Sequence, residues 1–135
     1  MPDSKLVLLA LTKAEVRDYI AAYANAASNA VHRAGFDGVK IHSAGDYLPD
    51  QFFQITSNKR TNRWGGEECR TRFSGDIVDA VVDAVGEDRV AIRLGLWSTF
   101  QGKYAFLRWS VRCRPVSCAL RARGCPIRDH PLHIL

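Results

Sequence analysis

The sequence predicts an α/β fold in which two helices and two short strands alternate along the chain. Two segments, 12–34 and 67–85, repeat apolar residues at intervals of three and four, the pattern of a helix with one buried face. Two runs rich in β-branched residues, 36–42 and 89–94, follow these helices and predict strands. Strands joined through a helix run parallel when they share a sheet, and a parallel sheet needs helices on both faces or closure into a barrel. Two strands complete neither arrangement.

The first helix is predicted to begin at Thr12 and to end near residue 34. Thr12 and Glu15 have the spacing of a capping box, in which each side chain accepts a hydrogen bond from the other residue's backbone N–H. Gly35 is placed to end the helix in a left-handed conformation. The strand that follows is predicted to end at His42.

The segment from residue 43 to 66 loses all periodicity, because glycines and a proline interrupt it, and it predicts a long loop. One turn of helix is expected within it, at 49–53. The second helix, 67–85, carries apolar residues four apart and closes at Gly86. The last predicted strand is 89–94.

Charge divides the 135-residue chain into two parts. The net charge of +5 separates into −1 for residues 1–102 and +6 for residues 103–135. No stretch approaches the roughly 20 apolar residues of a membrane span. The apolar run at 6–11 is too short for a signal peptide and lacks a basic region and a cleavage site. We therefore expect no membrane association and a cytoplasmic location.

Three polar side chains lie at or just after the predicted strand ends, where β/α barrels carry their chemistry. His42 ends the first strand, Tyr47 lies in the loop after it, and Arg93 lies at the end of the second strand. An imidazole, a phenol and a guanidinium could thus face one pocket. By spacing alone, each also has a structural interpretation, as a satisfied polar residue, a packing residue and an ion-pair partner.

Several runs of residues around these positions form an ordered set of motifs. They are GFDGVKIHSA (35–44), YLPDQF (47–52), SNKRTNRWGG (57–66) and RVAIRL (89–94). This set closely resembles the old yellow enzyme family, the FMN-dependent NAD(P)H oxidoreductases also called ene-reductases, which are built on an eight-stranded β/α barrel. The resemblance covers about residues 11–101 and implies FMN as cofactor and NAD(P)H as hydride donor.

The resemblance also implies roles for the three polar residues. His42 looks like the family histidine that hydrogen-bonds the carbonyl or nitro oxygen of an α,β-unsaturated substrate above the flavin. Stabilising the developing enolate oxygen is the largest electrostatic task in such chemistry. Tyr47 looks like the tyrosine that gives a proton to the α carbon as general acid. Arg93 looks like the arginine that faces the flavin and stabilises its reduced, negatively charged form.

Two departures from the family pattern bear on activity. Family members usually carry Asn-Gly between the histidine and the tyrosine, and the Asn is a second donor to the substrate oxygen, whereas this chain has Gly45 and Asp46. The chain also matches only about the fourth and fifth of eight β/α units, so the other strands of the flavin site have no counterpart in it. We therefore expect a fragment of a (β/α)8 TIM barrel that is weakly active or inactive.

The expected organisation is an N-terminal extension at 1–10, a partial FMN-oxidoreductase barrel at 11–102 and a non-homologous tail at 103–135. The tail is basic and rich in Cys and Arg, and its composition is compatible with disorder or with translation outside the ancestral reading frame. Its cysteines lack the close pair of a structural zinc site, so no metal is expected. The alternative function is a noncatalytic fragment or basic interaction protein that binds nucleic acid through this tail. The sequence leaves the oligomeric state open.

Overall fold

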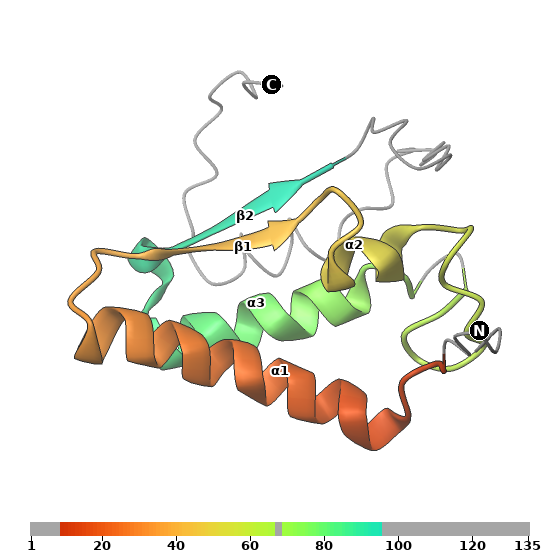
Figure 1. Ribbon diagram of the computed structural model, residues 1–135, viewed down its shortest axis with the longest axis horizontal. Helices are drawn as coiled ribbons and strands as arrows, with labels where there is room; N and C mark the ends of the chain where they lie inside the picture. Colours follow the sequence, from red (N-terminus) through yellow and green to blue (C-terminus); the bar gives the residue numbers. More distant parts are fainter. Residues whose placement is uncertain (1–8, 67–68, 96–135) are drawn as a thin grey trace, which may run out of the picture.

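The computed structural model describes residues 9–66 and 69–95, which form two layers (Figure 1). One layer is a two-stranded parallel sheet, and the other contains helices α1 and α3, which pack against each other and under one face of the sheet. The predicted α/β class and the parallel pairing are confirmed. In chain order the elements are α1 (Lys13–Ser28), η1 (Asn29–Arg33), β1 (Val39–Ser43), α2 (Leu48–Phe53), α3 (Arg72–Val85), η2 (Glu87–Arg89) and β2 (Val90–Leu94).

The first helix begins as predicted. Thr12 Oγ1 accepts from the Glu15 N–H at 3.2 Å, and the Thr12 N–H donates to Glu15 Oε2 at 2.7 Å, so both halves of the capping box are present. After α1 the chain widens into the π-helical turn η1, which the sequence pattern did not distinguish from α-helix. Gly35 then adopts φ 77°, the left-handed conformation expected of it.

The two strands are shorter than the runs that predicted them. β1 begins at Val39, not residue 36, because the backbone of Gly38 passes close to that of Arg89; a Cβ at Gly38 would lie 2.7 Å from the Arg89 carbonyl oxygen. Arg89 itself belongs to the 3₁₀ turn η2, so β2 begins at Val90. His42 is therefore the residue before the end of β1, which is Ser43.

The helix predicted from residue 67 begins at Arg72 in the described residues. Its predicted four-residue spacing is confirmed, since Phe73, Ile77, Val81 and Val85 are all buried. These side chains share one core cluster with Val16 of α1 and Ile41 of β1, and that core holds the two layers together.

The loop between β1 and α3 contains the predicted helical turn, seen as α2. Asn58 ties the loop together, because its Nδ2 donates to the carbonyl oxygens of Phe52 and Trp64, both at 2.7 Å. The Phe52 ring stacks on Phe73 at a centroid distance of 4.0 Å, and Trp64 is almost fully buried. α2 is thereby anchored to α3 below the end of β1.

Side chains of the sheet alternate between a covered and an open face. Ile41 and Ser43 are buried against the helical layer. Lys40, Ala91 and Arg93 alternate with the buried positions and are exposed. No described element packs on their face of the sheet (Figure 1). This open face carries His42 and Arg93, while Tyr47 meets His42 from the turn beyond the end of β1.

The described part of the chain contains no helix long and apolar enough to cross a membrane. The tail at 103–135, with its cysteines, and most of the predicted N-terminal extension lie outside the described residues. The division of the chain into three parts stays a prediction.

Candidate active site

His42 lies at the carboxyl end of β1, on the open face of the sheet. Its side chain is half-buried, and its Nδ1 is buried without a hydrogen-bond partner in the described part of the chain. Buried ring nitrogens are normally satisfied, so an unpaired one is a candidate for contact with a ligand.

Tyr47 lies against His42. The two ring centroids are 4.7 Å apart with an interplanar angle of 37°, and Tyr47 keeps 60% of its surface exposed. Tyr47 is the N-cap residue just before α2, and its backbone is extended (φ −67°, ψ 163°), which turns the chain from the loop into the helix. The structure thus brings together the two residues that sequence reasoning paired, with the phenol open to solvent.

Arg93 lies beside His42 on the neighbouring strand. The two residues are partners in the register of the parallel sheet, and register partners point to the same face about 4.8 Å apart. Arg93 is exposed and forms no ion pair with the described residues. It is a permanent cation on the open face next to the imidazole.

The turn between His42 and Tyr47 contains two consecutive left-handed residues. Gly45 has φ 63° and Asp46 has φ 70°. Glycine adopts this conformation freely, and aspartate is among the few other residues that tolerate it. Gly45 offers no side-chain donor here, as the sequence indicated. The backbone N–H of Asp46 points into the protein, where it donates to Asp50 Oδ2 at 2.9 Å.

Asp50 is a component of the site that sequence reasoning did not single out. It is only 3% exposed, and its Oδ1 accepts from Gln54 Nε2 at 3.0 Å. Burial raises the pKa of the Asp50 carboxyl, while the hydrogen bond from Gln54 and the charge of His42 oppose that rise. The only signal in the sequence was an acidic residue in the first turn of a short helix, which is common at helix starts.

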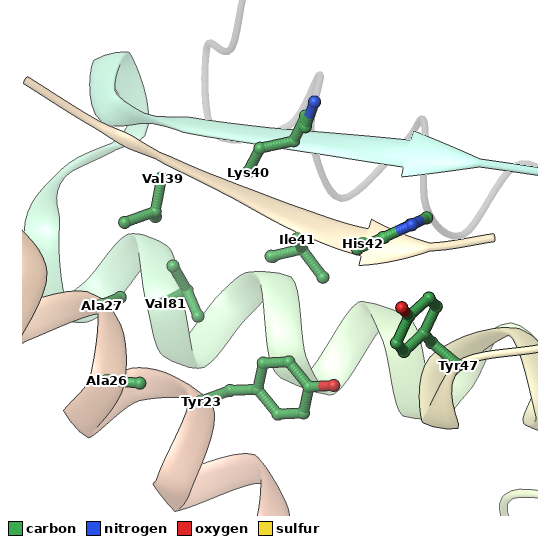
Figure 2. A pocket seen from close by; sticks show the side chains of 9 residues that line it. All are labelled: Tyr23, Ala26, Ala27, Val39, Lys40, Ile41, His42, Tyr47 and Val81. Atoms are coloured by element: carbon green, nitrogen blue, oxygen red, sulfur yellow. The ribbon is translucent and has the colours of Figure 1, made fainter. Parts of the chain in front are cut away.

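A groove of about 420 Å³ runs along the free edge of β1 and ends at His42 and Tyr47 (Figure 2). Its floor and walls are mostly apolar. Tyr23 of α1 points its hydroxyl along the groove toward the Tyr47 end, and burial raises the pKa of its phenol. The lining residues are Tyr23, Ala26, Ala27, Val39, Lys40, Ile41, His42, Tyr47 and Val81.

Comparison with known proteins gives a consistent family. The model of the NADH:flavin oxidoreductase / NADH oxidase family matches residues 4–109. A probable inactive dehydrogenase of Claviceps purpurea (strain 20.1) and a chanoclavine-I aldehyde reductase of Penicillium roqueforti are each 55% identical over 94 residues, which is 69% of this chain and 25% of theirs. The crystal structure of Old Yellow Enzyme from Pichia sp. AKU4542 superposes with a TM-score of 0.68 at 48% identity, covering 70% of this chain and 25% of that one.

The chain therefore spans about a quarter of the curated relatives it matches. Its βαβ unit, with α2 in the loop, corresponds to part of the old yellow enzyme barrel, and His42, Tyr47 and Arg93 all lie within the matched segment. By sequence and by structure, the chain belongs to the NADH:flavin oxidoreductase / NADH oxidase family and forms a segment of the old yellow enzyme TIM barrel.

Proposed function

We propose that this chain carries part of the active site of an FMN-dependent NAD(P)H oxidoreductase of the old yellow enzyme type, and that it is weakly active or inactive alone. The observation that carries the proposal is the contact between His42 and Tyr47 beside the exposed cation of Arg93. The noncatalytic alternative depends on residues 103–135, which lie outside the described residues, and no family match supports it.

The residues present fit one side of a flavin site. The open face offers a cation at Arg93 for the negative charge of reduced flavin, and His42 has a buried ring nitrogen that no described residue hydrogen-bonds. Bound FMN, reduced by NAD(P)H, would supply a hydride to an activated C=C bond. This chain's residues would do the rest: orient the substrate, stabilise charge and deliver a proton.

His42 would donate a hydrogen bond to the carbonyl oxygen of an α,β-unsaturated substrate and stabilise the enolate as its charge develops. The Tyr47 ring contacts the His42 ring, and Tyr47 is exposed, so its hydroxyl can reach a substrate that is bound to His42. A phenol is protonated at neutral pH and can donate to the α carbon of the enolate. His42 would thus act on the carbonyl oxygen and Tyr47 on the α carbon of the same substrate.

The Gly45-Asp46 turn limits this activity. Gly45 lies where the family usually supplies a second donor, and it has no side chain. Losing one such donor costs about 100-fold or more in turnover in well-studied oxyanion sites. The relative from Claviceps purpurea is itself described as a probable inactive dehydrogenase.

A hybrid barrel tests the proposal. Residues 11–95 of this chain would replace the matching segment of the Penicillium roqueforti reductase, and FMN content and the reduction of a simple cyclic enone by NADPH would be measured. We expect an FMN-loaded hybrid with slow turnover, and about a 100-fold gain when Gly45→Asn is combined with Asp46→Gly. An FMN-loaded hybrid in which His42→Ala changes nothing would contradict the proposal.

A further inference from the structure

The short turn from β1 to α2 decides whether Tyr47 reaches His42. Gly45 and Asp46 both adopt left-handed backbone conformations before Tyr47 returns to an extended one. Aspartate tolerates this conformation better than most residues but still favours other backbone angles, so contacts in the surrounding structure must hold Asp46 in it. The weak bond from the Tyr47 N–H to the Ala44 carbonyl, at 3.4 Å, is not sufficient.

Two neighbouring side chains of α2 hold both ends of the Asp46 residue. Asp50 Oδ2 accepts from the Asp46 N–H at 2.9 Å, and Gln51 Nε2 donates to the Asp46 carbonyl oxygen at 2.9 Å. Both bonds reach back out of the helix to the residue before its cap. The carbonyl and the amide of one left-handed residue are thus fixed by side chains five and four positions later.

The burial of Asp50 indicates that its carboxylate is there to accept these hydrogen bonds. A carboxylate that is 3% exposed is costly unless its oxygens are hydrogen-bonded. One oxygen is committed to Asp46 and the other to Gln54. A carboxylate that only favoured the start of the six-residue α2 could do so from the surface.

We propose that Asp50 and Gln51 are positioning residues that clamp the Asp46 residue in its left-handed conformation and so hold the Tyr47 ring against His42. The inference deepens the proposed function, because the clamp would align the proton donor with the group that binds the substrate oxygen. The contact itself exists without any cofactor, so it can be tested apart from catalysis.

The test uses the full 135-residue chain and the NMR cross-peaks between the His42 and Tyr47 rings. Two variants with side chains of nearly unchanged shape distinguish loss of the clamping hydrogen bonds from a general loss of structure. Gln51→Glu keeps the length of an exposed side chain but replaces the donor with an acceptor, so it should lose the cross-peaks. Asp50→Asn should keep them, because its amide oxygen can still accept from the Asp46 N–H while its NH₂ donates to a flipped Gln54.

Two further variants complete the design. Asp50→Ala should lose the cross-peaks, and Val85→Ala, a core change at the far end of α3, should keep them although it lowers stability. If Asp50→Ala does not fold, Gln51→Glu decides the outcome. Unchanged cross-peaks in Gln51→Glu, or their loss in Val85→Ala, would overturn the inference. Failure of the hybrid barrel to bind FMN would count against the proposed function and leave these cross-peaks unaffected.

Discussion

The residues around His42 are what make it suited to binding a ligand. Its Nδ1 is buried without a partner in the described residues, Tyr47 covers one side of its ring, and Arg93 is its neighbour on the adjacent strand. Each feature alone is ordinary in a protein. Together they leave a hydrogen-bonding group, a proton donor and a cation facing one open surface.

Substitution of Gly45 tests whether its left-handed backbone conformation contributes to stability. A Cβ added there would meet only Tyr47 Cδ2 at 4.0 Å, so space is available and Gly45→Ala should lower stability by about 1 kcal/mol through backbone conformation alone. Gly75 is the matched control, because it lies inside α3 with nothing within 4 Å of the added Cβ. Gly75→Ala should raise stability by about 0.5–1 kcal/mol. Urea unfolding measures both, and equal effects would contradict the argument.

Asp50 gives the site a pH signature. Its folded pKa is raised above the ordinary value of 3.8 by burial, so the folded state holds the proton more tightly than the unfolded state. Stability from this group is therefore highest at low pH and falls as pH rises above 3.8, until the folded carboxyl has also ionised. Asp50→Asn cannot ionise and should not show this loss.

The measurement for Asp50 is the unfolding free energy of the wild type and of Asp50→Asn across the acidic range up to neutral pH. The advantage of the variant should grow with pH above 3.8 and then level off. Groups that do not interact with Asp50, such as Glu15, titrate equally in both proteins and cancel in the difference, and the acidic side of the range keeps the contribution of His42 small. An advantage that shrinks with rising pH would show that the Asp50 pKa is lowered.

Among the elements, the helices and the helical turn in the loop were predictable, and the contacts that position the loop and the start of β1 were not. The capping box of Thr12 and the four-residue spacing from Phe73 to Val85 are local patterns, and the structure follows them. The beginning of β1 at Val39 depends on a backbone distant in sequence, and no local pattern records that. Asp50 was missed for the same reason, since its burial depends on how α2 folds back on the turn.

Asn58 holds the loop that anchors α2. Its Nδ2 donates to two carbonyl oxygens, and its Oδ1 accepts from the Arg60 N–H at 3.2 Å. Asn58→Ala should leave buried groups unsatisfied and cost about 1–3 kcal/mol. Asn25→Ala, on the exposed side of α1, should change stability by less than about 0.5 kcal/mol. Thermal unfolding compares the two, and a similar small effect for both would show that the loop does not depend on Asn58.

At the scale of the whole molecule, the described part is a layer of helices under a sheet whose other face is open. His42 and Arg93 lie on that face, and the groove of about 420 Å³ follows the free edge of β1 on the side of the helices, up to His42 and Tyr47. A complete barrel leaves no free strand edge and fills its interior with side chains. The resemblance of the motifs allowed this partial barrel to be predicted, because they lie at the strand ends and loops that carry a barrel's chemistry.

The most direct measurement is enone reduction by the FMN-loaded hybrid barrel with one of two tyrosines changed. Tyr47 and Tyr23 both line the groove, and only Tyr47 contacts His42. Tyr47→Phe should slow enone reduction by about 100-fold or more, as expected for the loss of a general acid, with reduction of the flavin by NADPH unchanged. Tyr23→Phe should leave both steps close to those of the unmodified hybrid. Equal effects of the two changes, or none from Tyr47→Phe, would contradict the assignment of Tyr47 as the proton donor of this site.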